Sequence, residues 1–161
     1  MENIVLILET SIINTWIMSS LWAWPIMEIL HFIGLSILLG SLLVIDLRLM
    51  GIFRKIHIEM IHSFLPLVFI GFFINFITGI LFVIGDPARY TANIGFWVKM
   101  CLVILALMNA IWFKLKISPK LSSWPPYGDT TYLSKFVGCF SLVTWFGVLL
   151  LGRLIPYIGT G

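Results

Sequence analysis

Four long apolar stretches constrain the fold of this chain more than any other feature. They cover residues 25–45, 64–84, 96–113 and 133–155, and polar connections separate them at 46–63, 85–95 and 114–131. A helix rises roughly 1.5 Å per residue, so about 20 apolar residues are enough to cross a hydrocarbon core of roughly 30 Å. The pattern predicts an all-α protein that is an integral membrane four-helix bundle.

The composition supports a membrane protein with one domain. Hydrophobic residues make up 60% of the 161 residues and charged residues only 11%. Soluble domains carry roughly 25% charged residues, so this chain has too few to cover a water-facing surface. We expect a single membrane domain over residues 1–161. The chain has no basic tract with interleaved aromatic residues, which argues against nucleic acid as a partner.

The segment 3–22 is long enough to cross a membrane, but polar residues such as Glu9 and Asn14 interrupt it. The connection from this segment to the apolar stretch 25–45 is very short for a chain that would have to reverse direction between two membrane spans. Trp16 and Trp22 suit the aromatic belt at a membrane surface. We therefore expect a helix at the interface that precedes the bundle. A fifth span is the alternative.

The basic residues predict the orientation. The face opposite the start of the first span carries Arg48, Arg54, Lys55, Lys114, Lys116, Lys120 and Lys135. The other face carries Arg89, Lys99 and Arg153, together with Glu2, Glu9, Glu28 and Asp86. By the positive-inside rule the first set is cytoplasmic. We expect a multi-pass protein of the bacterial cytoplasmic (inner) membrane with both termini outside the cytoplasm.

Ionisable residues at membrane depth are costly and mark candidate functional sites. Four of them have similar depth toward the outer side: Glu28, His31, Lys99 and Arg153. Glu28 and His31 share a helix face, and Trp24 lies one turn earlier on the same stripe. A buried imidazole in a small helical bundle is a common ligand of haem iron. The pattern predicts His31 as the metal ligand of a haem b, with Trp24, Glu28, Lys99 and Arg153 around the cofactor.

Other interpretations of this cluster remain open. His31 could simply hydrogen-bond to Glu28 or to a neighbouring helix, or it could relay protons. His57 and His62 lie at the cytoplasmic end, on the order of 15–20 Å from His31 by the helical rise, so they are not expected to bind the same iron. The sixth iron position would be open or filled by Lys99, Met27, Met100 or a neighbouring subunit. Arg153 could pair with Glu28 across the bundle.

Several other polar or small residues are predicted to pack rather than to bind. Asn75 lies between Gly71 and Gly79 at four-residue spacing, a pattern of close helix contact in membranes. Thr78 and Asn109 are polar groups at membrane depth and are assigned to packing as well. Cys101 and Cys139 are expected to be unpaired and buried.

Short motifs also suggest relatives. The chain contains Trp24-Pro25-Ile26-Met27-Glu28-Ile29-Leu30-His31-Phe32-Ile33-Gly34-Leu35, Asp46-Leu47-Arg48-Leu49-Met50-Gly51, Thr78-Gly79, a run from Phe96 to Lys99, and Gly152-Arg153. Together these motifs, within residues 22–157, resemble a family of small bacterial four-helix membrane proteins known as a domain of unknown function. The chain is more distantly similar to CopD-like copper-resistance proteins and to HemJ-type protoporphyrinogen oxidases.

The HemJ-type resemblance implies a bound haem b. That family pairs a histidine early in one helix with a lysine that begins a later helix, and His31 and Lys99 are the matching positions. The chain departs from that family at residues 46–51, which replace a Leu-Pro-Arg-Leu-type stretch.

The leading functional hypothesis is a haem b protein with an electron-transfer or redox-subunit role. It would work in contact with membrane lipid, as a homo-oligomer or in a larger redox complex. The alternatives are a HemJ-like oxidase, which would be a membrane oxidoreductase, and an ion- or proton-handling or structural subunit without haem.

Overall fold

The computed structural model describes residues 2–158, and Glu2 only by its backbone. Met1 and residues 159–161 lie outside the described residues. The two ends of the predicted domain 1–161, and the side chain of Glu2 in the charge balance, are therefore not covered.

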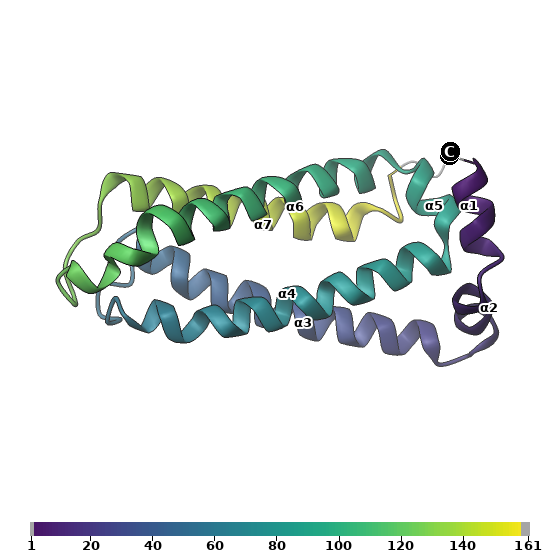
Figure 1. Cartoon of the computed structure of the whole chain (residues 1–161), viewed down its shortest axis with the longest axis horizontal. Coiled ribbons are helices and arrows are strands. Elements are labelled where there is room, and N and C mark those ends of the chain that lie inside the picture. The colour runs from purple at the N-terminus through teal and green to yellow at the C-terminus, as the bar shows by residue number, and fades with distance from the viewer. Residues whose placement is uncertain (1, 159–161) are drawn as a thin grey trace.

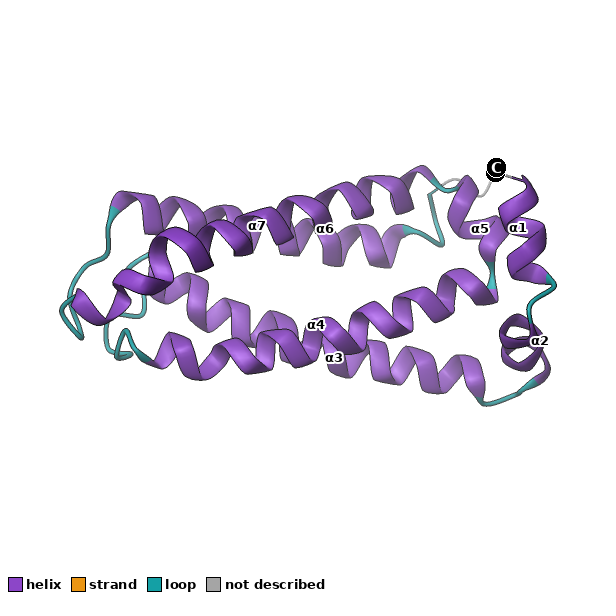
Figure 2. Ribbon diagram, in the orientation of Figure 1, coloured by secondary structure: helices purple, strands orange, loops and turns teal. Residues whose placement is uncertain are grey.

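Between residues 2 and 158 all regular structure is helical (Figure 2). The elements are α1 (Glu2–Glu9), α2 (Ile12–Ser19), α3 (Ala23–Leu49), α4 (Met60–Gly85), α5 (Pro87–Ala92), α6 (Ile94–Trp112), a π-helical segment η1 (Phe113–Ile117), a 3-10 helix η2 (Ser118–Ser123) and α7 (Tyr132–Leu154). The all-α class is confirmed. The four predicted apolar stretches correspond to α3, α4, α6 and α7, and each of these is long and apolar enough to cross a membrane.

The long helices extend further than the sequence indicated. The predicted connections 46–63 and 114–131 are partly wrong, because α3 continues to Leu49 and helical turns continue α6 to Ser123. Burial explains the difference. Leu49 is 1% exposed and Leu121 is 0% exposed, so the apolar faces continue past the first charged residues.

The segment 3–22 forms two short helices rather than one. Ser11 ends α1 and caps α2, since its hydroxyl accepts from the backbone N–H of Asn14. The amide of Asn14 then donates to the carbonyls of Ile84 (2.7 Å) and Gly85 (3.2 Å) at the end of α4. Each helix has 8 residues, a length of roughly 12 Å. Neither is long enough to be the alternative fifth span.

The long helices form two pairs, α3 with α4 and α6 with α7, which run antiparallel (Figure 1). The α3–α4 pair crosses closely at two glycines. A Cβ at Gly71 would lie 2.6 Å from the backbone nitrogen of Leu38 and 2.7 Å from the carbonyl oxygen of Gly34. Among the described long helices, α3 and α7 make the closest backbone contact between the two pairs, and the ring of Phe72 on α4 also meets that of Trp145 on α7.

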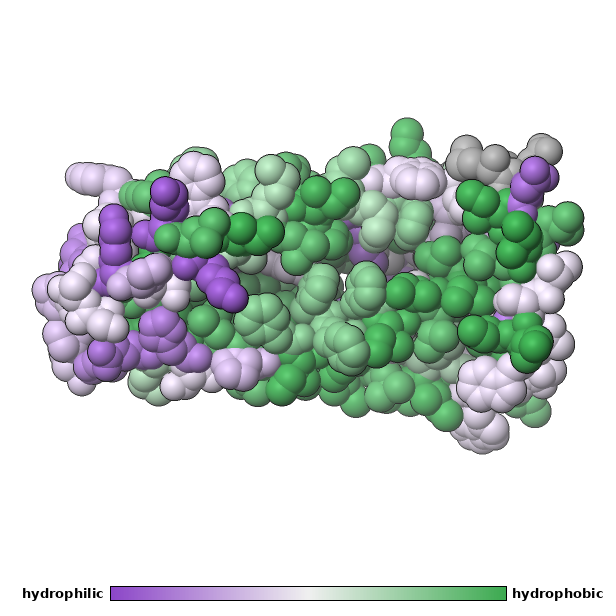
Figure 3. Space-filling model, viewed as in Figure 1, coloured by the Kyte–Doolittle hydropathy of each residue, from purple (hydrophilic) through white to green (hydrophobic). Residues whose placement is uncertain are grey.

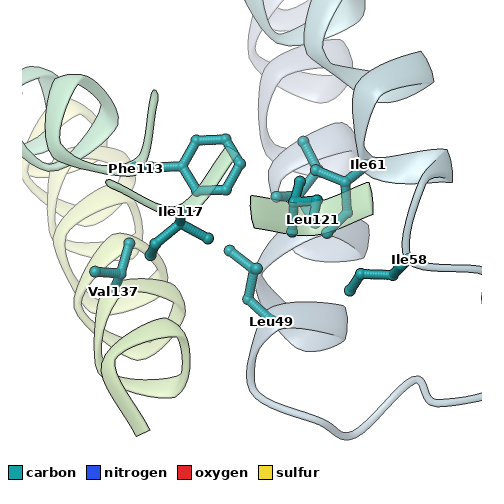
Figure 4. Packing of buried hydrophobic residues seen from close by; sticks show 8 residues of the cluster. Leu49, Ile58, Ile61, Phe113, Ile117, Leu121 and Val137 are labelled. Atoms are coloured by element: carbon teal, nitrogen blue, oxygen red, sulfur yellow. The ribbon is translucent and has the colours of Figure 1, made fainter. Parts of the chain in front are cut away.

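Two clusters of buried side chains fill the bundle. One lies at the end where α3 meets α4 and includes Leu49, Ile58, Ile61, Phe113, Ile117, Leu121 and Val137 (Figure 4). The other lies further along α3 and brings Leu38 and Leu42 against Trp145 and Val148 of α7. Toward α1 and α2, α3 diverges from α7 (Figure 1). The core therefore closes one end and the middle of the bundle.

The connections are fixed by caps. Thr131, one of the two residues predicted to cap the last helix, accepts from the backbone N–H of Ser134. Asn93 is 2% exposed and caps α6 in the same way. Its amide also donates to the carbonyls of Ile155 (2.8 Å) and Ile158. Asn93 thus ties the start of α6 to the end of α7.

Candidate functional site

His31 lies on α3, beyond the part of that helix that packs on α7. Its Nδ1 is 2.7 Å from the hydroxyl oxygen of Thr78 on α4. Its ring meets the ring of Phe82, one turn further along α4, edge to face at a centroid distance of 5.4 Å. The side chain is half-buried. His31 is therefore held on two sides by α4.

The partners of Thr78 indicate which imidazole nitrogen carries the hydrogen. The Thr78 hydroxyl lies 2.8 Å from the carbonyl oxygen of Ile74, to which it donates as helical threonines do. A hydroxyl has one hydrogen to give, so while it donates to Ile74 its oxygen can only accept from Nδ1–H of His31. That tautomer leaves a lone pair on Nε2, which is the form of histidine that binds metals.

Trp24 and Glu28 form the outer wall of this region. The indole N–H of Trp24 donates to a carboxylate oxygen of Glu28 at 3.1 Å, which shows that they share one face of α3. The indole ring also packs on Phe82, with centroids 5.5 Å apart. Trp24 and His31 thus contact the same phenyl ring.

Tyr90 on α5 stands close to this wall. Burial raises the pKa of its phenol, Arg89 opposes that change, and the charges of Asp86 and Glu28 add to it. A hollow of about 300 Å³, lined by Met18, Trp24, Asp86 and Arg89, opens nearby. The outer wall is thus polar and partly accessible.

Lys99 approaches from α6. It is half-buried and close enough to His31 for their charges to interact. Its Nζ lies beside α7, 3.3 Å from where a Cβ of Gly152 would be. Within residues 2–158 its ammonium makes neither a hydrogen bond nor an ion pair.

Arg153 follows Gly152, the residue of α7 that the Lys99 ammonium approaches. Its guanidinium lies over the ring of Tyr157, just after the end of α7, 5.4 Å from the centroid. The expected ion pair with Glu28 is not formed, because Glu28 accepts from Trp24 and Arg153 is exposed on α7. Near the diverging end the described contacts link Trp24 to Glu28, and link both Trp24 and His31 to Phe82.

His57 and His62 occupy the opposite end of the bundle. His57 packs edge to face on Tyr127 at 5.6 Å. His62 is in the first turn of α4, 16 residues before the Thr78 that contacts His31, which is a distance of roughly 24 Å along the helix. This is somewhat more than the roughly 15–20 Å expected from the sequence.

The residues assigned to packing behave in part as expected. Asn109 donates to the carbonyl of Val137 at 3.1 Å and links α6 to α7. Gly71 makes the predicted close contact, but a Cβ at Gly79 would meet nothing within 4 Å. Gly34 leaves no space beside His31, because Asn75 fills it; a Cβ at Gly34 would lie 2.6 Å from the Asn75 amide nitrogen.

The two cysteines are unpaired, but Cys101 and Cys139 are exposed on the helix surface rather than buried. Each belongs to an apolar run, but lies on a side of its helix that no other described element covers. An apolar neighbourhood in the sequence was therefore a poor guide to burial here.

No family model, curated protein or solved structure matches this chain. Within the described residues there is no group of three or more His, Cys, Asp or Glu side chains that could hold a metal ion. Haem differs from such a site because the porphyrin supplies four of the iron ligands, so a single histidine can anchor it.

Proposed function

We propose that this chain is a multi-pass protein of the bacterial cytoplasmic membrane, with both termini outside the cytoplasm. Two observations support this. Four helices have the length and apolarity of membrane spans, and the basic loop residues gather at the end where α3 meets α4. In this arrangement α1 and α2 lie at the surface of the cytoplasmic membrane that faces away from the cytoplasm. The exposed Trp16 of α2 (60%) and Trp22 in the turn before α3 (72%) suit that position.

We further propose that the protein binds haem b through Nε2 of His31 and acts in electron transfer. The hydrogen bond between His31 and Thr78 is the observation that carries this proposal. A metal-bound histidine commonly donates its second ring N–H to an oxygen, which fixes its tautomer and orientation. The Thr78 oxygen does this for His31.

The surrounding residues fit the same group. The ammonium of Lys99 lacks a partner among the described residues and would suit a haem propionate. The rings of Trp24 and Phe82 would wall one side of the site. Met27 lies one turn before His31 on the same helix, whereas Lys99 comes from another helix. Once bound, haem would supply one-electron redox chemistry at its iron.

The test is the absorption spectrum of the protein purified in detergent from haem-replete cells. The wild-type protein should show a Soret band, and His31→Ala should lose it while remaining in the membrane. His31→Gln should not restore it, because an amide is a poor iron ligand.

A variant that replaces both His57 and His62 with alanine is the matched control and should keep its haem. Loss of haem from this control in folded protein would contradict a site built on His31. A wild-type protein without a Soret band would overturn the haem proposal itself.

A further inference from the structure

Asp46 is a buried carboxyl at the contact between the two helix pairs. The sequence assigned it to a connection, but it lies inside α3 and is 3% exposed. Its Oδ2 is buried and has no hydrogen-bond partner. An orphaned buried oxygen is rare in native proteins and calls for a missing proton, water or ion.

The surroundings of Asp46 are small and largely uncharged. Gly138 of α7 comes so close that a Cβ there would lie 2.8 Å from the carbonyl oxygen of Asp46. Ser141, one turn further along α7, lies beside the carboxyl. Ser41 and Thr144 are other buried hydroxyls of these two helices, 5% and 4% exposed. The Thr144 hydroxyl is already used, since it donates to the carbonyl of Phe140.

No cation balances this carboxyl among the described residues. Arg48, two residues later, donates through Nε and Nη2 to loop carbonyls, and its Nη1 is buried without a described partner. Among the ionisable residues of the neighbouring elements, His62, Cys139 and Lys114 are exposed. The ammonium of Lys135, one turn before Gly138 on α7, pairs with Asp129. Ser141 is the described side chain that interacts with the carboxyl.

A lone carboxylate in such a place is strongly disfavoured, because burial removes its hydration and nothing replaces it. A proton removes that cost with no further ligands. A metal cation would need several oxygen ligands, and Ser41 and Ser141 are the two hydroxyls left to serve. We propose that Asp46 is a proton-binding site within the contact between α3 and α7. This proposal does not depend on haem.

The position gives the proton a structural role. Among the described long helices, α3 and α7 make the closest backbone contact between the two pairs. Release of the proton to water leaves a negative charge at that contact, against Gly138 and the apolar side chains around it. Binding of the proton therefore holds the pairs together, and its loss loosens them.

The test is infrared spectroscopy of the protein in detergent. A protonated carboxylic acid has a carbonyl stretch that carboxylates lack and that shifts in heavy water. At neutral pH the wild-type protein should show this band. Asp46→Asn should lose it, and Glu59→Gln, which changes an exposed carboxyl outside both proposed sites, should keep it. A wild-type protein without the band, or an unchanged band in Asp46→Asn, would overturn the proposal.

Thermal unfolding against pH gives the second measurement. The wild-type melting temperature should fall at alkaline pH as the infrared band disappears, and the melting temperature of Asp46→Asn should not follow it. If Asp46→Asn does not fold, the wild-type protein alone still decides, because band and melting temperature must change over the same pH range. Stabilisation of the wild-type protein by Na⁺ or Li⁺, but not by choline at equal ionic strength, would show that Asp46 binds a metal cation rather than a proton.

Discussion

The Thr78 hydroxyl interacts with two helices at once. It donates to its own helix at Ile74 and lies within hydrogen-bonding distance of His31 on the neighbouring helix. A histidine held only by apolar contacts could rotate and exchange tautomers. Thr78 restricts both, so the state of the imidazole depends on a residue that has no ionisable group.

We predict that Thr78→Val and Thr78→Ser differ sharply. Valine keeps the shape of threonine but cannot accept from Nδ1, whereas serine can. Loss of such a supporting hydrogen bond typically weakens metal binding about 10–100-fold. Haem content and midpoint potential should therefore change in the valine variant and stay near wild type in the serine variant. Equal behaviour of the two variants would show that Thr78 acts only through packing.

A second prediction concerns the pH dependence of Asp129, in the connection before α7. Its carboxylate accepts from Lys135 at 2.9 Å and pairs with Arg54 at 3.3 Å. The hydrogen bond from Lys135, followed by that from the Thr130 backbone, holds its pKa below the usual 3.8. Because the folded-state pKa is lowered, the contacts of the Asp129 carboxylate stabilise the folded protein at pH values above the usual pKa. This stabilisation is lost as the pH falls through the folded-state pKa.

Asp129→Asn should therefore melt at a lower temperature than wild type near neutral pH, and the two should converge in acid. Glu59→Gln is the control, since Glu59 is exposed and its side chain makes no ion pair within residues 2–158. A constant difference between Asp129→Asn and wild type across the pH range would rule out the carboxylate as its source.

At the scale of elements, the crossing of α3 and α4 positions the site. His31 and Thr78 face each other because the helices meet at Gly34 and Gly71 and continue antiparallel from there. At Gly71 the contact is with the backbone of Gly34 and Leu38, so no side chain there can move aside to admit a larger residue. The geometry at His31 is set by a contact about one to two turns away.

Gly71→Ala should destabilise the protein, because the new Cβ would lie 2.6 Å from the backbone nitrogen of Leu38. Overpacking of this kind typically costs about 1–3 kcal/mol. Gly79→Ala is a matched control on the same helix, where a Cβ meets nothing within 4 Å. The free energy of unfolding in detergent measures both. Equal stability of the two variants would show that the crossing can relax.

The sequence predicted elements better than contacts. Apolar runs of sufficient length were enough to find the four long helices and to recognise His31 as unusual at its depth. Gly71 and Gly79 have the same spacing from Asn75, and only the helix crossing distinguishes them. Asp46 and Arg48 looked like loop residues because charge usually ends a span. Their burial depends on partners in α7 and in the loops, which sequence periodicity does not reveal.

At the scale of the whole molecule, the two ends of the bundle differ in charge. Hydrophilic side chains gather at the end where α3 meets α4, and an apolar surface covers much of the rest (Figure 3). That end contains the connections after α3 and before α7, with Arg54, Lys55 and Lys135. The helix α1 and the end of α7 lie together at the other end (Figure 1).

Reporter fusions should reveal this arrangement in cells. Fusions after Arg54 and after Lys120 should be cytoplasmic, and a fusion at the C-terminus should be outside, because basic loops are retained in the cytoplasm. Alkaline phosphatase and green fluorescent protein report the two sides. A cytoplasmic C-terminus would reverse the orientation and move His31 toward the cytoplasmic face.

Arg48 has a consequence for the order in which the protein is made. It is 0% exposed, and it donates to Ile56 in the first connection and to Pro126 and Gly128 in the last. Pro126 is synthesised 78 residues after Arg48, a delay of roughly 4–16 s at about 5–20 residues per second. For that interval the guanidinium of an already emerged helix lacks two of its acceptors. The hydrogen bonds of Arg48, at the end of α3, are therefore completed only after the ribosome has synthesised the connection before α7.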